Sequence, residues 1–154
     1  MWTSYCGKRI RNWFPLRLYR TFRGPGPMSA KILLAEDNAA NRYLASFLLT
    51  HAGFEVVHAS NGDEACRLAQ DESPDLILMD IQMPEMDGYE AATRIHASPA
   101  SCSIPIVAVT SYAMLSDRNK ALDMGFVGYI EKPIQPQTFI EEISHFLPRK
   151  FPNQ

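Results

Sequence analysis

Short apolar runs alternate with segments of helical periodicity along most of the chain. The run Lys31–Ala35 predicts a buried strand, and the apolar residues after it recur at helical spacing up to Gly53, a residue type that commonly ends a helix. The residues that follow this helical spacing are Ala40, Leu44, Phe47 and Leu48. The periodic part of the chain therefore begins with a strand followed by a helix.

The same strand and helix alternation continues to residue 147. Further strands are predicted at Phe54–His58, Asp75–Met79, Ile104–Val109 and Val127–Ile130. Further helices are predicted at Asp63–Gln70, Tyr89–His96 and 115–124, and a last helix has a buried stripe of Phe139, Ile140, Ile143, Phe146 and Leu147. Because the strands are nearly all apolar, both faces of their sheet are expected to be covered. The alternation predicts an α/β fold with a doubly wound, five-stranded parallel sheet and five helices.

Length and composition exclude several classes of protein. A chain of 154 residues is about one domain, and its 46% hydrophobic and 21% charged residues are average for a globular protein. No apolar run approaches the roughly 18 residues of a membrane span. Cys6, Cys66 and Cys102 have neither disulfide-framework nor zinc-site spacing. The expected compartment is a reducing cytoplasm.

Charge divides the chain into two unlike parts. Residues 1–27 contain six basic residues and no acid, whereas the remainder holds nine basic residues against 17 acidic ones. The boundary is the Gly24–Pro27 run, which neither helices nor sheets tolerate well. We therefore expect a basic N-terminal tail over 1–28, a globular domain over 29–148 and a short tail over 149–154. The acidic domain itself is not expected to bind nucleic acid.

The basic tail admits several interpretations. It has the composition of a membrane-surface segment, or of an arm that binds nucleic acid. It could also be non-native upstream sequence, with Met28 as the true start. A transit peptide would contain more Ser and Thr, and a secretory signal would contain a longer apolar run.

Polar residues that suit one binding site lie at the ends of four predicted strands. In doubly wound sheets, ligands bind at the carboxyl ends of the strands, near the point where strand order reverses. The residues at these ends are Glu36, Asp37, Asp80, Thr110, Ser111 and Lys132. Each alone would be usual for a solvated strand end or a helix cap, but the combination predicts one metal and phosphate site.

The three carboxylates of this group require positive charge. At a separation of a few ångströms and an effective dielectric of about 20, each pair repels by about 4 kcal/mol. Oxygen ligands with open water positions favour Mg²⁺. One carboxylate can then act as nucleophile toward a phosphoryl group, and Lys132 and Thr110 can stabilise the oxygens of the transferred group. No Gly-rich phosphate loop is present, so ATP and NAD are not expected as cofactors.

Four segments resemble the receiver domain of response regulators in two-component signalling. They are ILLAEDN (32–38), DLILMDIQMPEMDGYE (75–90), PIVAVTSYA (105–113) and GYIEKPI (128–134). The resemblance extends over residues 31–148. It implies a flavodoxin-like sheet of strand order 2-1-3-4-5 and a bacterial signalling protein of the stand-alone type, acting through protein contact.

The resemblance assigns roles to individual residues. Asp80 would be the phosphoacceptor, Asp37 and Asp80 direct Mg²⁺ ligands, Glu36 a ligand acting through water, and Gln82 a ligand through its backbone carbonyl. Thr110 and Tyr129 would be the switch residues, and Lys132 would bind the phosphoryl group and precede a cis peptide bond to Pro133. The residues expected to tune hydrolysis are Gln82, Ser111 and Tyr112.

The resemblance also implies partners. A sensor histidine kinase or histidine phosphotransfer protein would donate the phosphoryl group from a phosphohistidine. Phosphorylation would change the surface made by the helix at 115–124, the strand at Val127–Ile130 and the last helix, which would bind a downstream target or a second copy of the chain. The protein would carry out its own phosphotransfer and dephosphorylation without being an enzyme in the ordinary sense.

Two other functions remain open from the residues alone. One is a Mg²⁺-dependent phosphohydrolase with Asp80 as nucleophile, although Gln82 stands where such enzymes commonly carry a second acid. The other is a regulator whose basic tail binds nucleic acid or an anionic membrane. Salt-sensitive binding that is lost with residues 1–27 would identify the latter.

Overall fold

The structure of the chain is a computed structural model that describes residues 30–111 and 114–148. The two predicted tails and Tyr112 lie outside these residues. The interpretations of the tail and the hydrolysis-tuning role of Tyr112 therefore remain predictions.

Five parallel strands form one sheet in the order β2-β1-β3-β4-β5. The strands are β1 (Lys31–Ala35), β2 (Glu55–Ala59), β3 (Leu76–Asp80), β4 (Ile106–Thr110) and β5 (Gly128–Glu131). Strand order reverses at β1, which pairs with β2 on one side and β3 on the other. The predicted fold class and strand order are confirmed.

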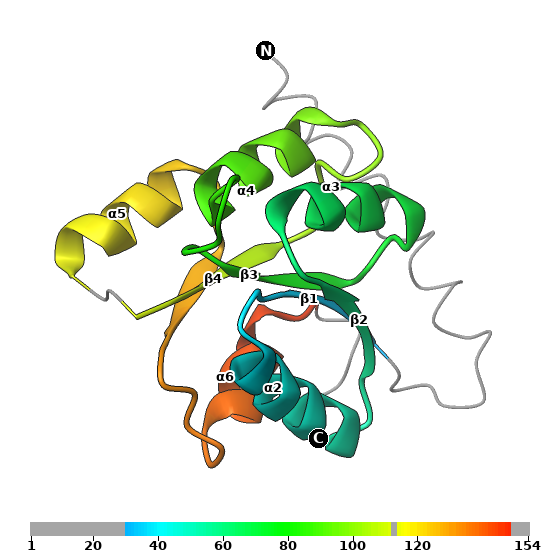
Figure 1. Ribbon diagram of the computed structural model, residues 1–154, viewed down its shortest axis with the longest axis vertical. Coiled ribbons are helices and arrows are strands. Elements are labelled where there is room, and N and C mark those ends of the chain that lie inside the picture. The colour runs from blue at the N-terminus through cyan, green and yellow to red at the C-terminus, as the bar shows by residue number, and fades with distance from the viewer. Residues whose placement is uncertain (1–29, 112–113, 149–154) are drawn as a thin grey trace.

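Helices cover both faces of this sheet (Figure 1). One face carries α3 (Gly62–Asp71), α4 (Gly88–Ala97) and α5 (Leu115–Asp123), and the other carries α2 (Ala39–His51) and α6 (Phe139–Phe146). In the described part of the chain, no helix combines the length and apolar character needed to cross a membrane.

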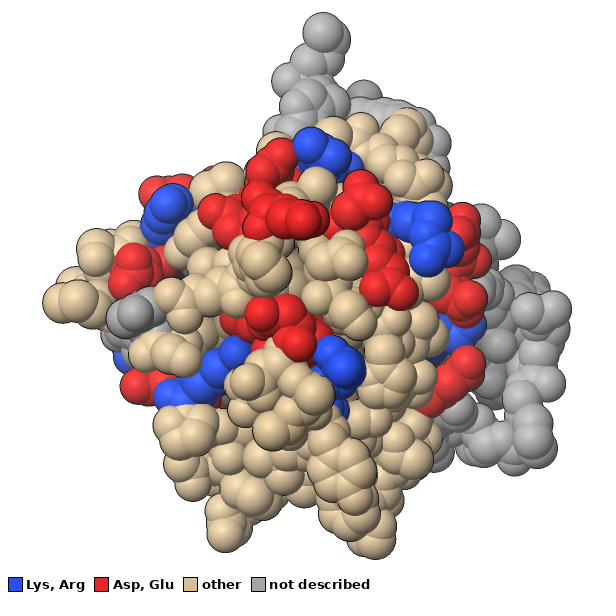
Figure 2. Space-filling view, in the orientation of Figure 1, with Lys and Arg blue, Asp and Glu red and all other residues tan. Residues whose placement is uncertain are grey.

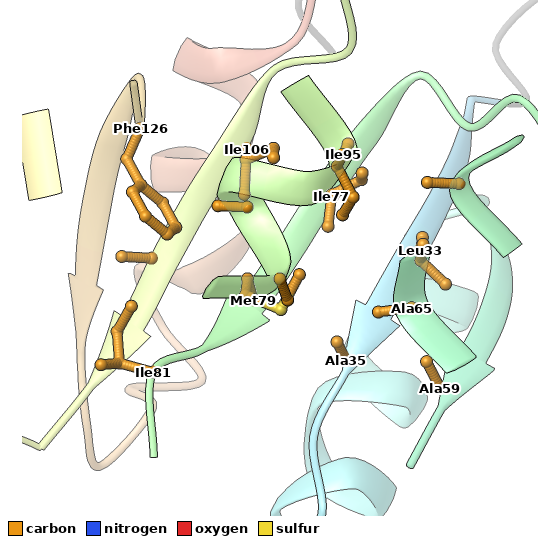
Figure 3. Packing of buried hydrophobic residues seen from close by; sticks show 14 of the residues in the cluster. Leu33, Ala35, Ala59, Ala65, Ile77, Met79, Ile81, Ile95, Ile106 and Phe126 are labelled. Atoms are coloured by element: carbon orange, nitrogen blue, oxygen red, sulfur yellow. The ribbon is translucent and has the colours of Figure 1, made fainter. Parts of the chain in front are cut away.

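Alternate strand residues fill two separate cores. Leu33, Ile77 and Met79 face the side of α3 and α4, as Figure 3 shows, whereas Ile32 and Leu78 face the side of α2 and α6. Side chains on successive strand residues point to opposite faces, so a strand covered on both sides must be apolar at every position. This double burial explains why the strands appear in the sequence as continuous apolar runs.

Four of the five strands end one residue later than predicted, and in β3 and β4 the difference concerns the site. Asp80 and Thr110 are the last residues of β3 and β4 rather than the first residues of loops. The ladder continues past them, because the Ile81 N–H donates to the Val109 carbonyl at 3.2 Å and the Lys132 N–H donates to the Thr110 carbonyl at 2.8 Å. The sheet therefore fixes the backbone of both predicted site residues.

Phe47 fits the helical spacing of apolar residues in α2, but its side chain does not lie on the buried face of this helix. The Phe47 side chain is 55% exposed, and its ring stacks between those of Tyr43 and His51. The buried face of α2 instead contains Ala45 and Leu49. At 100° per residue, a position two residues from both of these lies on the opposite side of the helix.

Candidate functional site

Three carboxylates meet where the strand order reverses. Glu36 and Asp37 follow β1, and Asp80 ends the neighbouring β3. One oxygen of each carboxylate lies within 4.8 Å of the others. Asp37 is exposed, whereas Glu36 and Asp80 are 3% and 2% exposed. The predicted convergence of these acids is present in the structure.

Lys132 contacts both of the buried acids. Its Nζ lies 2.8 Å from Oε2 of Glu36 and 3.1 Å from Oδ2 of Asp80. Lys132 follows β5, and the peptide bond to Pro133 is cis, as the resemblance implied. The ammonium group is therefore held between both carboxylates.

The surroundings of the site raise the pKa of both Asp80 and Lys132. Burial, and then the charge of Glu36, raise the pKa of Asp80 to about 7 despite the opposing effect of Lys132. Burial would lower the pKa of Lys132, but its hydrogen bond to Glu36 and the charges of Asp80 and Glu36 raise that pKa overall. Without a further cation, Asp80 thus keeps a proton up to about neutral pH, and Lys132 stays charged.

The donor set fits a hard divalent cation. Among residues 30–111 and 114–148, Lys132 is the one ammonium in contact with these three carboxylates, which leaves an excess of negative charge, and the side-chain ligand atoms are all oxygens. Mg²⁺ prefers such ligands and commonly keeps several waters, which an exposed carboxylate such as Asp37 permits. The residues that would hold it are those predicted, Glu36, Asp37 and Asp80.

The other predicted site residues occupy the edges of this cluster. Thr110 is buried at the end of β4, one residue beyond Val109, the strand partner of Asp80. Ser111 follows it and is exposed. Gln82 is exposed, and its backbone N–H donates to Oδ1 of Asp80 at 3.1 Å, while the metal-binding role of its carbonyl stays a prediction.

Tyr129 lies on β5, one strand beyond Thr110. Its ring packs against the core on the α3 and α4 side, and the Arg118 guanidinium lies 4.5 Å from the ring centroid. Tyr129 thus links β5 to α5 within the predicted switch surface.

The sequence analysis missed three residues that support the site. Asn38 donates its N–H to Oε1 of Glu36 at 3.0 Å and caps α2 by accepting from the Asn41 N–H. Arg42 donates from Nη1 to the Glu36 carbonyl at 2.9 Å. Gly88 begins α4 directly against the backbone of Asp80. An Asn immediately before a helix is a readable cap signal, but the other two contacts have no local signature.

Gly88→Ala is expected to destabilise the protein by about 2 kcal/mol, because the added methyl group overpacks a tight contact. A Cβ at this position would lie 2.5 Å from the Asp80 carbonyl oxygen and 2.8 Å from Ile81 Cα, and backbone atoms cannot move aside cheaply. Urea denaturation measures the change. Gly53→Ala tests backbone strain without a clash, since a Cβ at Gly53 would meet open space but the residue has a φ of 96°. Equal stability of Gly88→Ala and the native protein would contradict the predicted clash.

Acidic side chains predominate on the described surface. Residues 30–111 and 114–148 contain seven Lys and Arg against 17 Asp and Glu. Figure 2 shows the acidic side chains in several groups, one of them near the centre of the face with basic side chains beside it.

Several known proteins are similar to this chain in sequence and in architecture. The sequence model of the response regulator receiver domain matches residues 32–144. The polar-differentiation response regulator DivK of Brucella anthropi is 39% identical over 120 residues, which cover 78% of this chain and 98% of that protein. The chemotaxis protein CheY4 of Vibrio cholerae superposes with a TM-score of 0.74 at 29% identity, covering 77% of this chain and 99% of CheY4.

A further solved structure bears on the metal. The receiver domain of a sensor histidine kinase from Pseudomonas aeruginosa, which has a magnesium ion coordinated in its active site cleft, superposes with a TM-score of 0.71. It is 32% identical, and the match covers 77% of this chain and 97% of that one. With its family match, its strand order and its relatives in agreement, this chain belongs to the response regulator receiver domain family of two-component signalling.

Proposed function

We propose that this receiver accepts a phosphoryl group on Asp80 in a Mg²⁺-dependent reaction. The donor is a phosphohistidine of a sensor histidine kinase or of a histidine phosphotransfer protein, in the cytoplasm. The observation that supports this function is the buried Asp80 carboxylate, which lies beside two further acids and within 3.1 Å of the Lys132 ammonium. The magnesium-bound relative supports the choice of metal.

The chemistry requires only an ionised carboxylate and positive charge around the phosphoryl oxygens. An oxygen of the Asp80 carboxylate attacks the phosphorus atom of the phosphohistidine and forms a P–O bond. The P–N bond breaks, and the electron pair of that bond returns to the imidazole nitrogen of the donor. A bound Mg²⁺ supplies positive charge that favours ionised carboxylates and neutralises phosphoryl oxygens. Lys132 stabilises the same oxygens, and Thr110 donates its hydroxyl to one of them. Water later hydrolyses the acyl phosphate and restores the carboxylate.

The signal passes from Asp80 to a surface formed by α5, β5 and α6. Phosphorylation adds nearly two negative charges at the end of β3. Thr110 and Tyr129 then shift together, and the Arg118 contact transmits the movement of Tyr129 to α5. Large apolar side chains are exposed on and beside α5, where a downstream target or a second copy of the chain would bind. They are Met114, Leu115, Leu122 and Val127.

Intact-protein mass after incubation with a small-molecule phosphodonor tests this function. The native chain with Mg²⁺ is expected to gain one phosphoryl group, and neither Asp80→Asn nor native protein in EDTA should gain any. Absence of labelling in the native chain, under conditions that label a control receiver, would contradict the proposal. Continuous release of free phosphate without a labelled intermediate would instead favour a phosphohydrolase.

A further inference from the structure

We propose that Arg42 is a positioning residue that holds the Asp37 carboxylate toward the metal site. It acts through the backbone of Glu36 and has no contact with the carboxylate itself. This inference deepens the proposed function and rests on it, because it concerns the metal ligand that faces solvent.

Asp37 depends on its backbone for its position. Its side chain is exposed, and no described residue gives its carboxylate a hydrogen bond or an ion pair. Glu36 and Asp80 differ, because Lys132 contacts both of their carboxylates. A carboxylate without such partners is directed only by the φ and ψ angles of its own residue and by its rotamer. The backbone around Asp37 therefore decides whether its oxygens meet those of Asp80.

Contacts on both sides of Asp37 fix this backbone. On the N-terminal side, the Glu36 N–H donates to the Ala59 carbonyl at 3.0 Å. On the C-terminal side, the Asn38 N–H donates to Oε1 of Glu36 at 3.0 Å. Between these points lies the peptide that joins Glu36 to Asp37, whose orientation neither of these two hydrogen bonds sets directly.

Arg42 sets the orientation of that peptide. Nη1 of Arg42 donates to the Glu36 carbonyl oxygen at 2.9 Å, and the arginine side chain is half-buried on the first turns of α2. Because the peptide unit is planar, holding its carbonyl oxygen also fixes the direction of the bond that leads into Asp37. A charged donor makes a stronger hydrogen bond than a neutral one. Arg42 thus transmits the fixed geometry of α2 to the exposed metal ligand.

The positive charge of Arg42 would weaken Mg²⁺ binding, whereas its hydrogen bond to the Glu36 carbonyl would strengthen it. A guanidinium group near a cation site repels the cation, so removing that charge alone should tighten Mg²⁺ binding. Loss of the hydrogen bond should weaken binding, as loss of partners that orient metal ligands commonly does by 10–100-fold. The two roles therefore predict changes of opposite sign.

Calorimetric titration of the full chain with Mg²⁺ separates the effect of the Arg42 charge from the effect of its hydrogen bond. Arg42→Met removes the donors and keeps much of the side-chain length, and we expect its Mg²⁺ dissociation constant to rise about tenfold. Arg42→Lys keeps a donor and should recover most of the affinity. Arg67→Met is the matched control, since Arg67 forms an exposed ion pair with Asp71 on α3. It should bind Mg²⁺ as the native chain does.

A second measurement needs no metal. In EDTA, amide hydrogen exchange at Asp37 and Asn38 should be faster in Arg42→Met than in the native chain and Arg67→Met, with global stability measured in parallel. Unchanged exchange together with native or tighter Mg²⁺ binding would overturn the role of Arg42. If the native chain itself bound no Mg²⁺, the proposed function would fail, while the exchange rates would still decide whether Arg42 holds this loop.

Discussion

Asp80→Asn is expected to stabilise the metal-free protein by about 4 kcal/mol at pH 8, although it removes the proposed phosphoacceptor. The native Asp80 carboxylate is buried beside Glu36, and both features raise its pKa from 3.8 to about 7. Over each pH unit in which the folded state holds one proton more than the unfolded state, the free energy of unfolding changes by about 1.4 kcal/mol. Asparagine has similar shape and carries no charge, so the variant avoids this cost.

The sign of the pH dependence follows from which state holds the proton. Between pH 3.8 and about pH 7 the folded protein keeps a proton on Asp80 that the unfolded chain has released. Stability attributable to Asp80 therefore falls as pH rises through this window and is constant above it. The stability difference between Asp80→Asn and the native chain should be small near pH 4 and largest above pH 7. Mg²⁺ should reduce the difference at pH 8 by binding the native ionised site.

Urea denaturation in EDTA at pH 4.5 and pH 8 measures this effect. Both proteins share every other titrating group, so the difference between their unfolding free energies isolates Asp80. Asp71→Asn is the matched control, because Asp71 forms an exposed ion pair with Arg67, and such pairs contribute little. Equal stability of native protein and Asp80→Asn at pH 8 would show that the buried carboxylate is not destabilising.

Local sequence patterns were sufficient to predict the fold because its requirements are repetitive. A strand covered on both faces must be apolar throughout, as Leu76–Met79 is, and a parallel sheet forces a helix between strands. The position of Glu36, Asp37 and Asp80 at one edge follows from the same topology. Their closeness could therefore be predicted without knowing any side-chain contact.

Features that depend on packing between distant segments could not be predicted. Phe47 satisfied helical spacing, yet the sheet contacts the side of α2 that carries Ala45 and Leu49. The closeness of Gly88 to Asp80 requires the angle at which α4 begins against β3, which no sequence period encodes. Strand ends at Asp80 and Thr110 were misplaced by one residue, because a polar side chain can end an apolar run while its backbone still continues the ladder.

Lys132→Met is expected to slow phosphoryl uptake from a small-molecule donor by about 100-fold or more. In the described residues, Lys132 supplies the ammonium that contacts both Glu36 and Asp80, at 2.8 and 3.1 Å. Removing a single hydrogen-bond donor from a reacting oxyanion commonly costs 10²–10³ in rate, and Lys132 adds a full positive charge to that donor. Methionine keeps most of the side-chain volume, so packing changes little.

Mg²⁺ affinity distinguishes this catalytic effect from a damaged site. Lys132 repels a cation bound by the same carboxylates, so its removal should leave Mg²⁺ binding unchanged or tighter while phosphoryl uptake falls. Lys120→Met is the matched control, because the Lys120 ammonium lies over the Tyr89 ring at 4.3 Å and should affect neither quantity. Loss of Mg²⁺ binding and uptake together would indicate that Lys132 maintains the fold of the site. Uptake within tenfold of the native rate would mean that the metal alone can neutralise the transferred group, and that Lys132 serves the two buried carboxylates rather than the phosphoryl oxygens.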